Sequence, residues 1–369
     1  MTVLTKTRIR ELDTFRGLAF AAVVLQHTIG IYNQRGGFTT FDKWLAAGLF
    51  SAAKFAVPAF VFVTGLVLFY NYYDSLNYPG FIVKRFTEVG IPYLAWSLYY
   101  TSFYTRRWPV TPDYFKVYVK NILTGKGGYH LWFIVLIMQF YILFPVWRYL
   151  FQLAGRLLRS SASKWAVLAA AGFFYLWLVV WAYSTQFSTQ NPVLLSILKY
   201  RDHISLLWYL YFMIGGVAGL NLKKFRSLLK PLTIPALLTY VVLFYYFTHL
   251  MAGGDSCISL KYAGSFTPAM VIFSVATILL FYRLAITLSD KVHFFDTLGR
   301  YSLGAYLAHA AALNWTTLAV IYLTPGAGIT LHLLLTFILT VLISLVLTML
   351  LNRLPLGNFL TGRVRTKTG

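Results

Sequence analysis

The sequence predicts an all-α, polytopic integral membrane protein with about ten transmembrane helices. Of its 369 residues, 59% are hydrophobic and only 11% are charged, and the mean hydropathy is +0.66. A soluble domain usually has about a quarter of its residues charged. Apolar stretches close to the ~20 residues needed to cross a bilayer recur along the chain. Because no stretch is polar enough to form a separate soluble domain, we expect one membrane-embedded domain over 1–369, with short cytoplasmic tails at 1–15 and 352–369.

Ten apolar segments support this prediction, in order along the chain. The expected spans are 16–33, 46–70, 86–105, 129–150, 165–185, 204–220, 233–251, 266–286, 300–323 and 329–351. The basic N-terminus leads directly into the first span without a small-residue cleavage pattern, so no cleavable signal peptide is expected.

The basic residues set the expected orientation. With the N-terminus in the cytoplasm, roughly two-thirds of the Lys and Arg residues fall on the cytoplasmic side, as the positive-inside rule requires, and both termini are cytoplasmic. One external loop is an exception. We interpret it either as an interfacial helix or as a segment that approaches an anionic glycan or lipid, and its basic residues are Arg106, Arg107, Lys116, Lys120 and Lys126.

The net charge of +22 does not indicate a nucleic-acid partner. The basic residues lie in short loops between apolar segments, where they act as topology signals and contact anionic headgroups of membrane lipids. The single cysteine, Cys257, excludes an internal disulfide and a cysteine-based metal cluster.

The first span has a polar stripe on one face. Arg16 and His27 are eleven residues apart, which is ~20° more than three helical turns, so both project from the same face. The rise between them is ~16.5 Å, about half of a ~30 Å hydrocarbon core. Asp13 is three residues before Arg16 and is expected to pair with it. Gln26 lies beside His27.

Each residue of this stripe has a structural and a functional interpretation. Arg16 is either a cytoplasmic anchor or a binding group. His27 either makes a helix-to-helix hydrogen bond, worth about 1 kcal/mol in membranes, or has a functional role, as ionisable groups inside membranes usually do. A low-dielectric environment favours the neutral imidazole, which suits general-base chemistry on a hydroxyl. A metal site is not expected, because His27 has no companion histidine or carboxylate at ligand spacing on its own helix.

A second histidine is predicted at a matching depth. His309 lies nine residues after Arg300, a rise of ~13.5 Å from the expected cytoplasmic start of its span, with Tyr306 on an adjacent face. His27 and His309 are therefore candidates to line one cavity, with one ring as base and the other as orienting group or proton shuttle. The alternative for His309 is packing. Tyr306 is a candidate substrate contact.

Lys54 precedes Pro58 by four residues, so the proline removes the helical hydrogen bond to the carbonyl of residue 54. A helix that opens beside a lysine is a candidate site for a sugar or a carboxylate; the alternative is a lysine that extends to the outer headgroups.

Lys84 and Arg85, just before the third span, are candidates to bind phosphates and are otherwise topology signals. Glu88 is expected to pair with Lys84. His130 and Trp132 follow a glycine-containing loop on the outer side and are candidate sugar contacts, although Trp132 fits an aromatic belt equally well.

Several segments together resemble the acyltransferase-3 family of bacterial membrane O-acyltransferases. The Arg-x10-His pattern in "LDTFRGLAFAAVVLQH" is similar to the signature of that family. Similar segments follow in the same order: "VPAFVFVTGLVL", "VKRFTEVGIPYLAWS", "GGYHLWFIVLIMQFYILFPV" and "YSLGAYLAHA". The resemblance covers nearly the whole chain. Within the family, the chain most resembles the exopolysaccharide-modifying members, including the intercellular-adhesin type.

The resemblance implies transfer of an acyl group, usually acetyl, from cytoplasmic acyl-coenzyme A to a hydroxyl of an extracytoplasmic or lipid-linked sugar. It also implies a bacterial cytoplasmic membrane location and a possible polysaccharide synthase or export partner. This chain departs from some members of the family in two ways. Its third span begins with Lys84, Arg85 and Glu88, where some members have further arginines. Its sequence ends about 18 residues after Leu351, where some members continue into a hydrolase-like domain.

Two other functions are alternatives to acyl transfer. An exporter or flippase of a polysaccharide or lipid-linked sugar has midplane polar groups too, but such transporters often contain inverted repeats, which this sequence lacks. A purely structural or sensory protein would leave Arg16, His27 and His309 unexplained.

Overall fold

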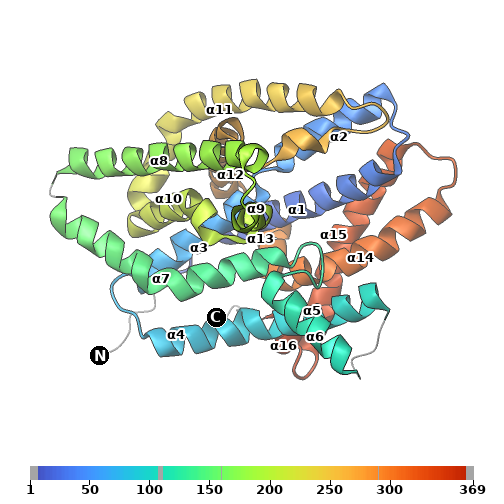
Figure 1. Cartoon of the computed structure of the whole chain (residues 1–369), viewed down its shortest axis with the longest axis horizontal. Helices are drawn as coiled ribbons and strands as arrows, with labels where there is room; N and C mark the ends of the chain where they lie inside the picture. Colours follow the sequence, from blue (N-terminus) through green and yellow to red (C-terminus); the bar gives the residue numbers. More distant parts are fainter. Residues whose placement is uncertain (1–6, 107–110, 159, 290, 363–369) are drawn as a thin grey trace. The chain divides into compact units, whose positions relative to one another are not determined.

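The computed structural model describes residues 7–106, 111–158, 160–289 and 291–362, and the elements in these residues are helical, with no strand among them (Figure 1). The predicted all-α, polytopic membrane class is confirmed. Of the expected tails, 1–6 and 363–369 lie outside the described residues, as does Arg107.

The chain divides into two compact units. The first unit comprises Met1–Phe60, Arg226–Ser265 and Ile272–Gly369, and the second comprises Val61–Phe225 and Phe266–Val271. Three helices begin in one unit and end in the other, namely α3 (Ala56–Tyr72), α11 (Leu222–Ala252) and α12 (Pro268–Leu288).

The remaining elements belong to one unit each. The first unit contains α1 (Glu11–Arg35), α2 (Thr40–Ala53), the 3₁₀ turn Leu260–Ala263, α13 (His293–Arg300), α14 (Ser302–Leu323), α15 (Ile329–Arg353) and α16 (Asn358–Thr361). The second contains α4 (Tyr78–Arg85), the π turn Phe86–Gly90, α5 (Ile91–Thr105), α6 (Pro112–Thr124), α7 (Trp132–Leu157), α8 (Ser161–Ser188), α9 (Pro192–Lys199), the 3₁₀ turns Arg201–His203 and Ser205–Trp208, and α10 (Tyr209–Leu220).

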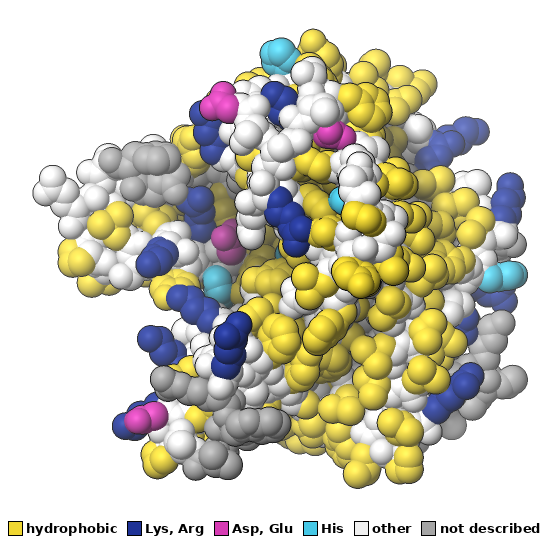
Figure 2. All heavy atoms as spheres, turned by 90° about the vertical axis from the view of Figure 1, so that its right-hand side faces the viewer, with side chains coloured by type: hydrophobic (Ala, Val, Ile, Leu, Met, Phe, Trp, Pro, Cys, Tyr) yellow, Lys and Arg dark blue, Asp and Glu magenta, His cyan; other side chains and the backbone are white. Residues whose placement is uncertain are grey.

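Seven helices in the described residues are long and apolar enough to cross a membrane, counting α2 and α3 as one segment, and Ser205–Leu220 is a shorter apolar helix. All ten expected spans are helical, but α5 and α14 are not among the seven. α5 has only 15 residues, several of them Tyr and Ser, and in α14 residues such as His309 and Tyr306 reduce the hydropathy. On the face that Figure 2 shows, hydrophobic side chains cover a broad area, as expected for a surface in contact with lipid.

The start of α1 packs directly against the backbone of α13. A Cβ added at Gly17 would lie 2.3 Å from the carbonyl oxygen of Phe295, and one added at Gly299 would lie 1.7 Å from that of Asp13. The hydroxyl of Thr14 donates a hydrogen bond to Asp296 across the same contact. Only residues without a side chain allow two helices to approach this closely, and α13 leads within two residues into α14.

Hydroxyl residues at four-residue spacing line one face of α15. Thr336, Thr340, Ser344 and Thr348 are all completely buried. The hydroxyls of Thr340 and Thr316 are 2.7 Å apart, which joins α15 to α14, and those of Thr336 and Tyr32 are 2.8 Å apart, which joins α15 to α1. Small and hydroxyl-bearing residues are the usual packing surface between membrane helices, because lipid chains provide no hydrophobic driving force for association.

The expected opening of the helix near Lys54 is confirmed. α2 ends at Ala53 and α3 begins at Ala56, with Lys54 and Phe55 in a turn between them. Pro58 has no N–H with which to continue the helix, and the regular pattern resumes when the amide of Ala59 donates to the carbonyl of Phe55.

In the second unit, the loop that we predicted to be external contains α6, a helix with two distinct faces. Tyr114 is buried, and the Tyr118 hydroxyl donates to the carbonyl of Leu94 in α5. Phe115 and Leu123, at 64% and 72% exposure, lie on the other face, beside Lys116. Of the two interpretations of this loop, a helix with an exposed apolar edge is the arrangement expected of an interfacial helix, and its place at the membrane surface stays a prediction.

Candidate functional site

Asp13 connects two arginines at the start of α1. The Arg16 guanidinium lies 3.4 Å from the Asp13 carboxylate, so the expected pair is confirmed. Arg8, which the sequence analysis did not single out, makes a closer pair with the same carboxylate, and its Nε donates over 3.0 Å. The Arg16 side chain keeps 30% of its surface exposed and is therefore accessible to an anion.

Glu11 fixes the start of α1 to two other helices of the first unit. Its carboxylate is 2.5 Å from the guanidinium of Arg226 and accepts a hydrogen bond of 3.2 Å from the hydroxyl of Tyr282. A buried carboxylate is stable only when it is paired and hydrogen-bonded in this way. Sequence analysis missed this role. The only signal was a charged residue immediately before an apolar segment.

The two predicted histidines lie together. The ring centroids of His27 on α1 and His309 on α14 are 5.3 Å apart, and the ring planes differ by 27°. His309 is fully buried, whereas His27 is partly exposed. The expected proximity of these rings is confirmed.

His309 is held in one orientation. Its Nδ1 lies within hydrogen-bonding distance of the carbonyl oxygen of Tyr306. A carbonyl oxygen only accepts, so Nδ1 carries the proton, and in the neutral ring Nε2 is then the nitrogen with the lone pair. The Tyr306 ring, 5.4 Å away between centroids, and Phe20, edge-on at 6.2 Å, enclose the imidazole. Tyr306 therefore positions His309, and its role as a substrate contact stays a prediction.

The interruption between α2 and α3 lies beside the paired histidines. The Gln26 side chain donates a 2.7 Å hydrogen bond to the carbonyl of Ala53 and so satisfies an acceptor at the helix end. Lys54 donates to the Ser265 hydroxyl over 3.3 Å and lies close enough to His27 for the two side chains to interact electrostatically. The structure thus groups His27, His309 and Lys54.

In the second unit, Arg85 is already engaged. Its guanidinium lies 3.2 Å from Glu88, donates to the Tyr72 hydroxyl over 3.1 Å, and lies 5.3 Å from the ring centroids of both Phe81 and Tyr141. These contacts are typical of a structural anchor, and a phosphate would have to compete with Glu88 for it.

The expected pairing of Glu88 with Lys84 was wrong. Glu88 pairs with Arg85, and Lys84 makes no ion pair within the described residues. The helix widens into a π turn over Phe86–Gly90, so the four-residue spacing of an α-helix no longer holds there. Lys84 is therefore a better candidate than Arg85 for the predicted phosphate contact, because Arg85 is already paired with Glu88.

His130 and Trp132 lie in aromatic surroundings. His130 is completely buried, with its ring edge-on to Tyr100 at 5.1 Å. This burial favours packing, and a sugar contact for His130 stays a prediction. Trp132 is partly exposed, and its ring centroid lies 5.7 Å from that of His203. The glycine-containing loop turns at Gly125, which has a φ of 67° and closely approaches Trp132.

Lys126 of this loop contacts a neighbouring tyrosine. Its ammonium donates a 2.8 Å hydrogen bond to the Tyr200 hydroxyl. This hydrogen bond, together with the positive charge, lowers the pKa of the Tyr200 hydroxyl.

No group of three or more His, Cys, Asp and Glu side chains in the described part of the chain is arranged to hold a metal ion. The chemistry available at the paired histidines is proton transfer to and from a hydroxyl or a thiol, with Lys54 as a nearby positive charge.

Comparison with known proteins gives weak but extensive similarity to one group of curated proteins. The chain is 23% identical over 312 residues, 82% of its own length and 82% of the relative, to the "Probable poly-beta-1,6-N-acetyl-D-glucosamine export protein" of Staphylococcus aureus strain MSSA476. The corresponding proteins of strains MW2 and MRSA252 are similar to the same extent. No solved structure is significantly similar to the chain.

The family comparison covers almost all of the sequence. The acyltransferase-3 family model, described as an acyltransferase domain, matches residues 9–351. This range includes α1 with its polar stripe, the interruption at Lys54 and the helix that carries His309. The chain belongs to the acyltransferase-3 family of integral membrane acyltransferases.

Proposed function

We propose that this protein transfers an acyl group, most simply acetyl, from acyl-coenzyme A to a hydroxyl of an extracytoplasmic or lipid-linked glycan. The observation that carries the proposal is the stacking of His27 on His309 in a member of an acyltransferase family. Two imidazoles on different helices, beside the positive charge of Lys54, form a group suited to proton transfer during acyl transfer.

The reaction proceeds by direct attack. His27 removes the proton of the acceptor hydroxyl while the hydroxyl oxygen bonds to the carbonyl carbon of the thioester. The carbon–sulfur bond then breaks, and the imidazolium returns its proton to the departing thiolate. His309, with Nδ1 directed to the Tyr306 carbonyl, presents Nε2 as a second proton acceptor. Lys54 stabilises the negative charge that develops on the carbonyl oxygen.

The donor enters from the side of the membrane at which α1 begins. We propose that this side is the cytoplasm of a bacterial cell and that both chain termini lie there. Arg16 and Arg8 bind phosphates of the donor, and Asp13, which pairs with both guanidiniums, holds them in place. The roles of Lys84, Arg85, His130 and Trp132 in binding donor or acceptor stay separate predictions for the second unit.

A single domain acting on one substrate pair is the simplest organisation, since the family match extends through both units. The acceptor glycan is proposed from the family and from the name of the relatives in Staphylococcus aureus, which refers to poly-N-acetylglucosamine. A polysaccharide synthase or exporter is the corresponding partner.

The test is transfer of radiolabelled acetyl from acetyl-coenzyme A to glycan in membranes that contain the protein. His27→Ala is expected to lower kcat by about 10²–10⁴-fold, the usual contribution of a general base. His332→Ala is the matched control, because His332 lies in the same unit and contacts the Thr324 carbonyl. Full transfer by His27→Ala at equal expression would refute the role of His27.

The second candidate function is export of a polysaccharide, which the name of the relatives favours. Mass spectrometry of surface and lipid-linked glycans from cells with and without the gene separates the two functions. Loss of acyl groups from glycan that still reaches the surface supports transfer. Loss of surface glycan, with acylation of the retained glycan unchanged, supports export.

A further inference from the structure

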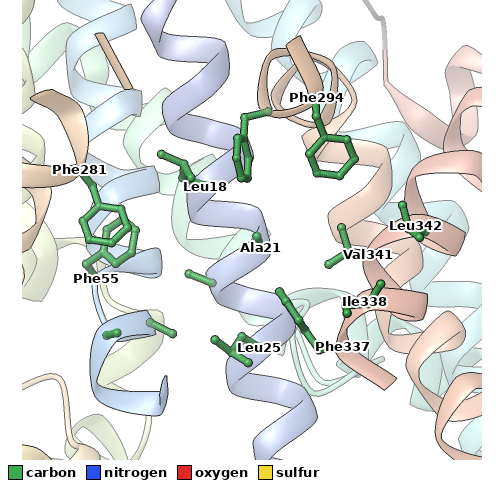
Figure 3. A pocket seen from close by; sticks show the side chains of 14 residues that line it. Leu18, Ala21, Leu25, Phe55, Phe281, Phe294, Phe337, Ile338, Val341 and Leu342 are labelled. Carbon is green, nitrogen blue, oxygen red and sulfur yellow. The ribbon is translucent and has the colours of Figure 1, made fainter. Parts of the chain in front are cut away.

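The first unit contains an apolar pocket that the proposed chemistry does not use. Its volume is about 380 Å³. Along α1 the pocket is lined by Leu18, Ala21, Ala22 and Leu25. Figure 3 shows Leu18, Ala21 and Leu25 between Phe55 and Phe281 on one side and side chains of α13 and α15 on the other. The alanines of α1 and α2 leave the space that larger residues would fill.

The pocket lies on the reverse face of α1 from the paired histidines. Leu25 precedes His27 by two residues, so the two side chains point ~160° apart around the helix. Its lining contains no ionisable residue, and a molecule bound there would not meet the ring nitrogens. The pocket is therefore separate from the proposed acyl-transfer site, and the inference below does not rest on the proposed function.

The pocket opens towards the surface that faces lipid. Ile338 and Leu342 of α15 and Phe294 of α13 line it and are 49%, 42% and 42% exposed. Ala53 and Phe55, in contrast, are almost fully buried and form its inner wall. The rim is thus continuous with the membrane-facing surface, and lipid chains have lateral access to the cavity.

Polar groups suited to a phosphate adjoin the rim. His293 directly precedes Phe294 and Lys291 lies three residues before it, and both are exposed. From Leu18 to Leu25 the pocket extends ~10.5 Å along α1, about a third of the hydrocarbon core. A cavity of this size lined by alkyl and aromatic groups offers water no hydrogen-bond partners and is suited to an apolar ligand.

We propose that this pocket binds one acyl chain of a bilayer phospholipid, whose phosphate lies beside Lys291 and His293 on the side of the membrane at which α1 begins. The chain fills the space between α1 and α15. Because lipid tails outside the pocket are equally apolar, the preference comes from fit to the cavity, not from a hydrophobic driving force.

The test uses full-length protein in proteoliposomes that contain phosphatidylcholine with a diazirine on one acyl chain. After irradiation, labelled peptides are mapped by mass spectrometry. The proposal predicts labelling concentrated in the α1 segment 18–25 and the α15 segment 337–342. Labelling spread evenly over all helices that contact lipid would overturn it.

Variants fill the pocket selectively. Ala21→Phe places a ring in the cavity and is expected to reduce labelling of both segments several-fold. Ala319→Phe is the control, because Ala319 is exposed on α14 and does not line the pocket. Equal labelling of wild type and Ala21→Phe, with both proteins monodisperse, would contradict the proposal; Val341→Phe repeats the test from α15 if Ala21→Phe does not fold.

Competition identifies the source of the chain. Unlabelled phosphatidylcholine or phosphatidylglycerol should reduce the labelling in proportion to its mole fraction. Displacement by a polyprenyl phosphate at mole fractions where phospholipids have no effect would assign the pocket to a lipid-linked substrate and overturn the phospholipid proposal.

Discussion

The close contact between α1 and α13 predicts that replacing glycine by alanine has opposite effects on protein stability at two positions of α1. Gly17 and Gly30 both lie in α1. A Cβ at Gly17 would lie 2.3 Å from the Phe295 carbonyl oxygen, whereas a Cβ at Gly30 would meet no atom within 4 Å. Changing Gly to Ala inside a helix stabilises the helix by ~1 kcal/mol where there is room for the methyl group.

The expected free-energy changes follow from these distances. At Gly17 the two backbones must separate by ~1 Å, at a cost of about 1–3 kcal/mol for overpacking. The separation also weakens the hydrogen bond from Thr14 to the Asp296 carboxylate, which is worth about 1.5–3 kcal/mol. After subtracting the gain in helix propensity, we expect Gly17→Ala to destabilise the protein by about 2–4 kcal/mol and Gly30→Ala to stabilise it by up to ~1 kcal/mol.

Thermal unfolding in detergent measures both variants. Gly17→Ala should lower Tm by on the order of 5–10 °C, and Gly30→Ala should leave it unchanged or raise it slightly. Gly17→Ala with the Tm of wild type would refute the close approach of α1 and α13, and with it the argument that this contact positions the start of α1.

Three further predictions follow from particular side chains. Glu11→Gln should destabilise the protein by about 1–2 kcal/mol, because it leaves Arg226 without its carboxylate partner. If the two residues act as a pair, adding Arg226→Met to this variant should lower the free energy of unfolding little further. Denaturant titration measures both values. Lys84→Ala should raise the KM for acyl-coenzyme A with little change in kcat, whereas the control Lys223→Ala should change neither. An unaltered KM in Lys84→Ala would show that Lys84 does not bind the donor. Lys54→Met should lower kcat and Lys54→Arg should restore part of it; equal rates in all three proteins would show that Lys54 stabilises no charge in the reaction.

Hydropathy and helical geometry predicted much of the fold. The ten apolar segments are helical because a chain in lipid must satisfy its backbone hydrogen bonds internally. The break at Lys54 followed from Pro58, and the pair of Asp13 with Arg16 followed from helical spacing. The α5 and α14 spans show where hydropathy is a poor guide, since side chains such as His309 and Tyr306 face the protein interior and reduce the apolar average.

Other features depend on contacts between distant segments, which no local pattern contains. The similar positions of His27 and His309 along their helices can be read from the sequence, but the stacking of their rings depends on how α14 packs against α1. Arg8 lies before the helix, so helical spacing could not connect it with Asp13. The predicted pairing of Glu88 with Lys84 was wrong because no local pattern indicates the π turn over Phe86–Gly90. The apolar pocket arises from alanines on separate helices and has no local signature.

The central claim is that His27 and His309 form one acyl-transfer centre, and a double-mutant cycle on kcat tests it most directly. Residues that act as a unit have strongly non-additive effects. We predict that His27→Ala and His309→Ala each reduce acetyl transfer and that the double variant is no slower than His27→Ala alone. Independent, multiplicative losses, or transfer at the wild-type rate by either single variant, would contradict the claim.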